Sequence, residues 1–381
     1  MSNNMDQQPK HPLRSIYFYP TESCNLKCIH CWIRPAYAPD EKSYQRQNQE
    51  NVSVEVMDRV VRDALPLGLS HVKFTGGEPF VHPGLFEFID CFSGHGLSLS
   101  FETNGTLLSA GMVQRLCKHN VTQISVSLDG SHADIHERIR GVRGSFEKAV
   151  NGIQLLMEHQ IDPQVIFCLQ KINAHDLENT IRLAYKMKVK LFEINPMIFV
   201  GIRESSENGC EGLSLKELLD LENKVETEYA DRYPNMHIDL YLPPALKGMR
   251  ELARHPICSC AIFNICGILS NGDVSICGIG SRNRELVMGN VKEKSVSKIW
   301  EEGILFKEIR EQVPLHLKGV CRRCLFKHHC LGFCRADVIS HEKTVLNSYQ
   351  VCEEACRKGL FPESRLLEES ELSRVHGEWN S

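Results

Sequence analysis

Three cysteines near the start of the chain have a spacing suited to a metal or cluster site. They form the run Cys24-Asn-Leu-Lys-Cys28-Ile-His-Cys31, directly after a short apolar segment. Three thiolates on one loop can hold three irons of a [4Fe–4S] cluster and leave the fourth iron without a protein ligand. A cluster needs such an open position if it is to bind a substrate. The alternative is a zinc site in which His30 completes the ligand set.

A second concentration of cysteines lies late in the chain, between Cys258 and Cys356. Eight of them are spaced as Cys260-x5-Cys266-x10-Cys277, then Cys321-x2-Cys324-x5-Cys330-x3-Cys334 and, after 17 further residues, Cys352. Cys258 and Cys356 lie beside these positions, and either could take the place of one of the eight as a ligand. His328 and His329 precede Cys330, so a pair of zinc sites is the alternative to iron–sulfur clusters here.

The bulk composition favours metal ligation over disulfides. The chain has 44 Lys and Arg against 48 Asp and Glu, a net charge of −4. This balance gives no electrostatic support for a nucleic-acid or anionic-membrane partner. The first 15 residues lack the apolar core of a signal peptide, and no apolar stretch approaches the roughly 20 residues of a membrane span. We therefore expect a cytoplasmic protein, and stable disulfides are rare in that compartment.

Three isolated cysteines receive a different interpretation. Cys91, Cys117 and Cys168 lie in apolar strand or helix contexts. Free cysteine behaves as a small hydrophobic residue in such places. We predict that these three are core residues without a role in the chemistry.

The segments that must position the first cysteines alternate between strand and helix patterns. Strands are predicted at 15–19, 71–74, 97–102, 123–127, 165–169 and 191–194. Helices are predicted at 52–65, 85–92, 110–118, 146–159, 177–187 and, after a polar break at 203–212, at 215–229. This alternation predicts a parallel sheet with helices on its outer face. Six units are fewer than the eight of a closed barrel, so the expected fold is α/β, a partial and open (β/α)6 barrel.

The cysteine-rich end has little helical periodicity, which predicts a small loop-rich domain held together by metal. The expected organisation is a polar tail at 1–13, the partial barrel at 14–235, a bridging segment at 236–257, the cysteine-rich domain at 258–356 and a charged tail at 357–381.

The CxxxCxxC run after the first strand of a partial β/α barrel resembles the signature of the radical S-adenosylmethionine (SAM) superfamily, with Trp32 at a position that is usually aromatic. The resemblance implies that Cys24, Cys28 and Cys31 are the catalytic cysteines and hold a cluster whose free iron is chelated by SAM. It also implies the reaction. The reduced cluster splits SAM into methionine and a 5′-deoxyadenosyl radical, which takes a hydrogen atom from a substrate.

Segments at successive strand ends resemble the SAM-binding motifs of this superfamily. The implied SAM-binding residues are Gly76, Gly77, Glu78, Glu102, Asn104, Ser127, Arg140 and Asn195. In Thr75-Gly-Gly-Glu-Pro79, glycines allow close backbone approach and the Glu78 carboxylate can accept bonds from an ammonium. Ser127 or Glu102 would contact the ribose. Arg140, in preference to Arg138, would pair with the SAM carboxylate, and Asn195 lies either at the adenosine or in an ordinary turn.

The later cysteines closely resemble the SPASM domain, a twin-cluster extension of many radical SAM peptide maturases. The resemblance implies two auxiliary [4Fe–4S] clusters, and so three clusters in all. The implied ligands are Cys260, Cys266, Cys277 and Cys334 for one, and Cys321, Cys324, Cys330 and Cys352 for the other. Each cluster would act as a staple for a domain with a small core of its own.

By analogy with this family, the favoured function is maturation of a ribosomally made peptide through cross-linking, oxidation or epimerisation. The implied partners are a peptide or small-molecule substrate and an external flavodoxin- or ferredoxin-like electron donor. Only 14 residues precede the first strand, so we expect no leader-binding domain there, and a separate leader-peptide-binding protein is one way to recognise a precursor.

Three alternatives remain open. They are an enzyme of haem- or quinone-type cofactor biosynthesis, a sulfatase maturase, and a non-catalytic iron–sulfur or zinc scaffold. Sulfatase maturases place an aspartate directly after the cysteine that Cys277 matches. This chain has Gly278 at that position, which argues against sulfatase maturation.

Overall fold

The computed structural model describes residues 10–33, 35–47, 50–197, 210–255, 260–281 and 283–368. Cys258 lies outside these residues, and so does the expected polar break at 203–212 up to position 209. No helix in the described part of the chain is both long and apolar enough to cross a membrane.

One ten-stranded sheet organises the chain, in the order β12-β11-β10-β1-β4-β5-β6-β7-β8-β9. Its strands are β1 (Ser15–Phe18), β4 (His71–Phe74), β5 (Ser98–Thr103), β6 (Val121–Ser127), β7 (Gln164–Leu169), β8 (Leu191–Pro196), β9 (His237–Leu240), β10 (Ile265–Ile268), β11 (Asp273–Ser275) and β12 (Val287–Asn290). The pairs from β10 through β1 to β9 are parallel, and β11 and β12 are antiparallel. The six predicted strands are confirmed. β9 and β12 are the two ends of the order, so the sheet is open, as expected.

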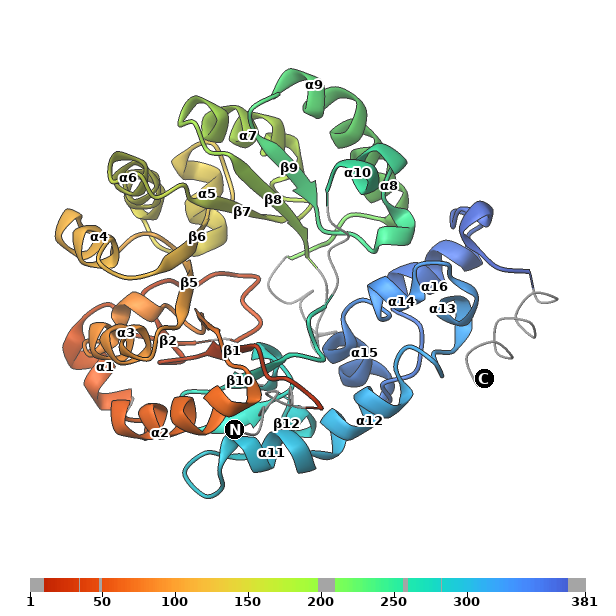
Figure 1. Ribbon diagram of the computed structural model, residues 1–381. Coiled ribbons are helices and arrows are strands. Elements are labelled where there is room, and N and C mark those ends of the chain that lie inside the picture. Colours follow the sequence, from red (N-terminus) through yellow and green to blue (C-terminus); the bar gives the residue numbers. More distant parts are fainter. Residues whose placement is uncertain are drawn as a thin grey trace, which may run out of the picture.

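Helices cover the outer face of this curved sheet (Figure 1). They are α1 (Glu41–Gln47), α2 (Val54–Ala64), α3 (Leu85–Gly94), α4 (Ala110–Leu116), α5 (Ala133–Arg140), α6 (Ser145–Glu158), α7 (Leu177–Lys186), α8 (Leu215–Lys224) and α9 (Ala230–Arg232). A further helix, α10 (Met249–Arg254), lies next to Glu193 and Asp239 on the inner face. In α2 the Ser53 side chain caps the N-terminus by accepting from the Val56 amide, while Met57, Val60 and Val61 are buried on one face. The cap and the apolar stripe explain why this segment forms a helix against the sheet.

Strand alternation gives the sheet an apolar outer face and a polar inner face. On the outer face the rings of Phe18, Phe74 and Phe101 are buried, with centroid separations of 5.8 Å and 4.7 Å along the series. Burial of each such ring stabilises the fold by roughly 1.5–3 kcal/mol. On the inner face Lys73 and Glu102 form an ion pair. The core therefore lies outside the sheet, and the polar inner face is left for chemistry.

The C-terminal part contains more regular structure than its composition predicts. The segment 236–257, expected to be a bridge, contains β9 and α10, and the cysteine-rich part supplies β10, which pairs with β1. The remaining helices are α11 (Val296–Glu302), α12 (Ile304–Gln312), α13 (Gly319–Arg323), α14 (Lys327–Cys330), α15 (Arg335–Glu342) and α16 (Gln350–Arg357). Helices α13–α16 lie at the open side of the sheet (Figure 1). There Arg365 donates to the carbonyl oxygens of Pro244 and Ala245 at 3.1 and 2.7 Å.

Candidate active site

The loop after β1 carries Cys24, Cys28 and Cys31 at the carboxyl end of the parallel strands. Cys24 ends β2 (Ser23–Cys24), which pairs with β3 (Ala36–Tyr37), and it is buried, whereas Cys28 and Cys31 are half-buried. All three thiols are free. Three thiolates within one short loop fit a cluster that keeps one iron open.

Backbone contacts with the end of α5 hold this loop. The amides of Lys27 and Ile29 donate to the carbonyl oxygens of Arg140 and Ile139 at 3.0 and 2.9 Å. Gly141 ends α5 in the left-handed conformation with φ of 72°, and a Cβ there would overlap the Lys27 carbonyl oxygen. The glycine is therefore required both by its dihedral angle and by the close approach of the cysteine loop.

The glycine-rich segment also packs directly against the cysteine loop. The Gly77 amide donates to the Thr21 carbonyl at 3.1 Å, and the Glu78 amide donates to the Ser23 carbonyl at 2.9 Å. A Cβ on Gly76 would lie 2.6 Å from the Thr21 carbonyl oxygen, and one on Gly77 would overlap that of Ser23. In this structure the missing side chains of both glycines make room for the cysteine loop.

The Glu78 side chain is buried and surrounded by hydrogen-bond donors of the protein. Its side chain accepts from the Thr103 hydroxyl at 2.7 Å, the Asn104 amide at 2.8 Å and the Phe80 amide at 3.1 Å. The residue is 1% exposed. Burial raises the pKa of its carboxyl to about 7, against these hydrogen bonds, which lower it. Both carboxylate oxygens already have partners in the protein, so this geometry gives Glu78 a positioning contact between two strand ends.

Asn104 joins the end of β5 to the cysteine loop. Its amide nitrogen lies 2.9 Å from the Asn25 side-chain oxygen and 3.9 Å from the Cys24 sulfur. Its side-chain oxygen accepts from the backbone and the hydroxyl of Thr106 at 2.9 and 2.6 Å. The side chain predicted to reach SAM therefore lies beside one of the three loop sulfurs.

Arg140 brings a buried positive charge to Cys28. Its Nε lies 2.7 Å from an oxygen of Asp129, and its guanidinium donates to the Cys28 sulfur at 3.7 Å. Burial alone would lower the pKa of Arg140, but Asp129 and Cys28 raise it above its ordinary value. Arg138 is exposed, so of the two candidate arginines only Arg140 lies at the cysteine loop.

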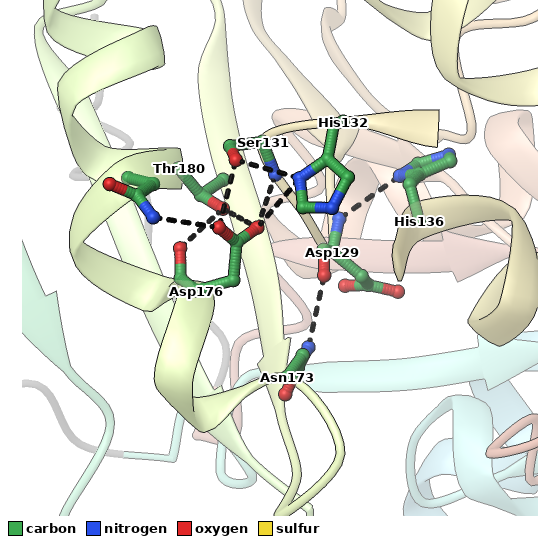
Figure 2. A network of polar contacts seen from close by, with 8 residues as sticks. Asp129, Ser131, His132, His136, Asn173, Asp176 and Thr180 are labelled. Carbon is green, nitrogen blue, oxygen red and sulfur yellow. Dashed lines mark hydrogen bonds and ion pairs between the residues drawn. The ribbon is translucent and has the colours of Figure 1, made fainter. Parts of the chain in front are cut away.

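A polar network beneath this pair fixes the ends of β6 and β7 (Figure 2). The Asp129 carboxylate accepts from the Cys168 amide at 2.9 Å, while its carbonyl accepts from the Asn173 side chain at 3.1 Å. Asp176 accepts from the amide and hydroxyl of Ser131 at 2.6 and 2.8 Å. Asn173 and Asp176 had no motif that could have identified them.

Polar side chains line the inner face of the sheet below the cysteine loop. Glu102 accepts from the Thr75 hydroxyl at 2.7 Å and pairs with Lys73. Burial would raise the pKa of Glu102, yet Lys73 outweighs this and lowers it. Asn195 donates to Glu193 at 2.8 Å. Ser127 ends β6 in a half-buried position.

Two of the three isolated cysteines differ from the prediction. Cys117 is exposed, so its interpretation as a core residue is wrong. Cys91 is half-buried and packs against the core, as expected, whereas Cys168 is half-buried and does not belong to it. Cys168 alternates with the buried Phe167 and Leu169 and therefore lies on the inner face. Its pKa is raised by burial and by Asp129, and Cys28 is among the groups that act on it.

Four of the later cysteines line a single cavity. Cys321, Cys324, Cys330 and Cys352 surround it together with Phe333 and Tyr349. Burial raises the pKa of Cys324 to about 11 and that of Cys330 to about 12. Four convergent thiols fit a [4Fe–4S] cluster, whose binding would remove their protons. Cys356 on the same helix as Cys352 is exposed and lies outside this set.

The second auxiliary group contains three of its four predicted cysteines. Cys260, Cys277 and Cys334 are all half-buried and pack against the same apolar core. The pKa of Cys334 is raised by burial and then by Cys277 and Cys260, which is consistent with three neighbouring thiols. Cys266 is fully buried in the apolar core, paired with Ile16 on β1.

Strand alternation explains why Cys266 is separate. The next residue, Gly267, faces Cys277, because a Cβ on Gly267 would lie 2.5 Å from the Cys277 carbonyl oxygen. Consecutive residues of a strand face opposite sides. Cys266 therefore faces away from the group, which does not support its predicted role as a ligand; among the described residues, Cys260, Cys277 and Cys334 are the predicted ligands that lie near one another.

Comparisons with known proteins identify the families that this chain resembles. Residues 18–184 match the Radical SAM superfamily, and residues 258–325 match the SPASM iron–sulfur cluster-binding domain. The chain is 27% identical over 357 residues to the AdoMet-dependent heme synthase of Methanosarcina barkeri. The alignment covers 89% of this chain and 96% of that protein. It is 23% identical over 325 residues to the mycofactocin maturase MftC of Mycolicibacterium smegmatis, covering 83% and 76%.

A solved structure shows the same fold. Streptococcus suis SuiB, bound to the precursor peptide SuiA, superposes with a TM-score of 0.70 at 19% identity and covers 91% of this chain and 77% of SuiB. SuiB has also been solved with S-adenosylmethionine.

Proposed function

Because the chain is an enzyme with a radical SAM domain followed by a SPASM iron–sulfur domain, we propose that it matures a ribosomally made peptide by hydrogen abstraction. When bound, SAM and a reduced cluster supply a 5′-deoxyadenosyl radical, and the protein supplies binding, orientation and electrostatics. The observation that carries the proposal is that one loop at the carboxyl ends of the strands carries Cys24, Cys28 and Cys31, beside the buried Arg140.

The residues predicted to bind SAM divide into two kinds. Gly76, Gly77, Glu78 and Asn104 hold the cysteine loop or border it, so we assign them mainly to positioning. Glu102, Ser127 and Asn195 belong to the inner face, where they would bind the nucleoside. Arg140 keeps a guanidinium next to Cys28, where it would attract the SAM carboxylate at the open iron.

We assign one auxiliary cluster to Cys321, Cys324, Cys330 and Cys352, because these four line one cavity. The other would use Cys260, Cys277 and Cys334. This gives three clusters in total. The electron that reduces the first cluster would come from an external flavodoxin- or ferredoxin-like donor, and a separate protein is one way to present a leader peptide.

Two relatives support a peptide substrate. One is named a mycofactocin maturase, and the other, SuiB, has been solved with the precursor peptide SuiA. Cofactor biosynthesis stays the second candidate because a heme synthase is 27% identical over most of this chain. Two features disfavour sulfatase maturation: the glycine at position 278 and the lack of room for a side chain there. A Cβ on Gly278 would overlap the buried Tyr19 hydroxyl, so an aspartate cannot occupy this position without displacing Tyr19.

The test compares two sets of cysteines in anaerobically reconstituted enzyme reduced with dithionite. The substrate is a synthetic peptide encoded by an open reading frame beside the gene. Cys28→Ala should abolish both 5′-deoxyadenosine formation and product. Cys321→Ala combined with Cys324→Ala should leave some 5′-deoxyadenosine formation and abolish product, provided that the variant is folded. Cys117→Ala is the matched control because Cys117 is exposed and its thiol contacts the His159 carbonyl, which belongs to none of the three groups.

Two outcomes would contradict the proposal. If the Cys28 variant still forms 5′-deoxyadenosine, the loop does not hold the SAM-cleaving cluster. If the folded Cys321/Cys324 variant converts substrate at the native rate, the auxiliary cluster is structural only. We also expect that neither the native enzyme nor Gly278→Asp forms formylglycine in a sulfatase-derived peptide, which mass spectrometry of the peptide can check.

A further inference from the structure

A cavity of about 260 Å³ lies at the opposite end of the sheet from the cysteine loop. His237, which lines it, is the first residue of β9, and it is paired with Leu191, the first residue of β8. The segment that follows β9 returns along the inner face and ends in α10, which adds Glu251 and, just after the helix, His255. The cavity is therefore enclosed between the edge of the sheet and α10, away from the proposed radical chemistry.

Two imidazoles and one carboxylate converge in this cavity. His237 Nε2 lies 3.1 Å from one oxygen of Glu251, and His255 Nε2 lies 3.8 Å from the other. The two rings are stacked with centroids 3.6 Å apart and an interplanar angle of 13°. One ligand atom from each of the three residues lies within 4.8 Å of the others. Each side chain is half-buried, so the group is neither a dispersed surface cluster nor sealed from solvent.

The charges around the cavity favour a bound cation. Glu193 and Asp239 line it with Glu251, and Lys247 is the one ammonium among its described lining residues. Lys247 is already paired with Asp239. Burial raises the pKa of Glu193, and the nearby Asp239 adds to this. Burial would also raise the pKa of Glu251, but the His237 contact lowers it.

We propose that His237, Glu251 and His255 bind one divalent first-row transition metal ion, for which Zn²⁺ is the probe. Two imidazoles and a carboxylate form a ligand set that suits zinc and its neighbours. Zinc bonds of about 2.0–2.2 Å place ligand atoms roughly 3.3 Å apart. Ligand atoms that lie within 4.8 Å of one another therefore need to close by up to about 1.5 Å. The ion would connect α10 to the edge strand β9, and its remaining positions would face the cavity. This inference does not depend on the proposed reaction.

The test uses reconstituted holoenzyme with its clusters in place. The protein is treated with a mild chelator, given one equivalent of Zn²⁺, desalted and measured for zinc and iron by mass spectrometry. Wild type should retain one zinc, and X-ray absorption at the zinc edge should show only nitrogen and oxygen neighbours. His255→Ala and the conservative Glu251→Gln should weaken zinc binding by at least the 10–100-fold that loss of a supporting partner costs. Their iron content and 5′-deoxyadenosine formation should not change.

A matched control tests the other group of this kind in the described chain. Asp58, Cys91 and His95 on α2 and α3 also place three ligand atoms within 4.8 Å. His95→Ala should retain zinc as wild type does. A sulfur neighbour at the zinc edge, zinc lost in His95→Ala, or full zinc retention in His255→Ala would overturn the proposal. Added zinc should also raise the thermal midpoint of wild type but not of His255→Ala.

Discussion

The cysteine loop after β1 and the auxiliary group beside β10 assemble their ligands in different ways. Cys24, Cys28 and Cys31 lie within eight consecutive residues, so their spacing alone brings them together. Cys260, Cys277 and Cys334 come from segments far apart in the chain, and the pairing of β10 with β1 joins them to the barrel. Cys266 is close to Cys260 in sequence, yet it faces the apolar core. Short spacing thus predicts ligands on a loop and fails on a strand, whose residues alternate between two faces.

The largest effect should come from removing the loop ligands together. Replacing Cys24, Cys28 and Cys31 by alanine should reduce the iron content from roughly twelve to roughly eight per chain, by four irons per cluster. SAM cleavage should disappear entirely, while the auxiliary clusters persist because their ligands lie elsewhere. Iron and acid-labile sulfide after anaerobic reconstitution are the measurement. Zinc in place of iron after anaerobic purification would contradict the cluster assignment.

A matched pair of cysteines tests the auxiliary group. Cys260→Ala should lose one auxiliary cluster, about a third of the iron. Cys266→Ala should keep all of the iron and lose only about 1 kcal/mol of stability, since it leaves a small cavity in the core. Iron content and thermal midpoint, measured side by side, check both. Equal iron loss in the two variants would restore Cys266 as a ligand.

A pair of glycines tests how the loop is held. Gly77→Ala places a methyl group on the Ser23 carbonyl, and strain of about 1–3 kcal/mol should displace the cysteine loop and lower 5′-deoxyadenosine formation. Gly94→Ala, at the end of α3, has no atom within 4 Å of the added carbon. It should leave activity unchanged. The contact would be dispensable if both variants cleaved SAM at the native rate.

The pH dependence of stability tests the buried carboxyl of Glu78. The folded pKa of Glu78 is about 7 against an ordinary 4.5, so between these values the folded state binds more protons than the unfolded state. Stability should therefore fall as pH rises through this window, by up to about 3 kcal/mol. Glu78→Gln should lose this dependence.

Glu102 should give a pH dependence of stability with the opposite sign. Because its pKa is lowered in the folded state, the ionised carboxyl stabilises the fold at pH values above the unfolded-state pKa. This stability is lost as the pH falls through the folded-state pKa. Thermal midpoints at pH 5 and pH 8 compare wild type with Glu78→Gln, and midpoints above and below pH 4.5 compare wild type with Glu102→Gln. If wild type and Glu78→Gln change in parallel with pH, the carboxyl of Glu78 titrates normally in the fold.

The strand positions and the loop cysteines could be predicted because local patterns encode them. Alternating residues such as Phe74 and Lys73 indicate a strand with two different faces, and a thiol spacing within one loop needs no tertiary contact. The positioning role of the Glu78 carboxylate could not be predicted in this way. Its partners Thr103 and Asn104 lie on another strand end, and their approach depends on the parallel pairing of β4 with β5.

By itself, the sequence determined the cysteine groups, the β/α alternation and therefore the class of chemistry. Only the tertiary structure decided that Arg140 pairs with Asp129 beside Cys28, that Cys266 faces the core, and that His237 meets Glu251 and His255. The physical reason is the range of the interactions. Spacing and periodicity act over a few residues, whereas these pairings depend on which strand edges and helix ends the sheet brings together.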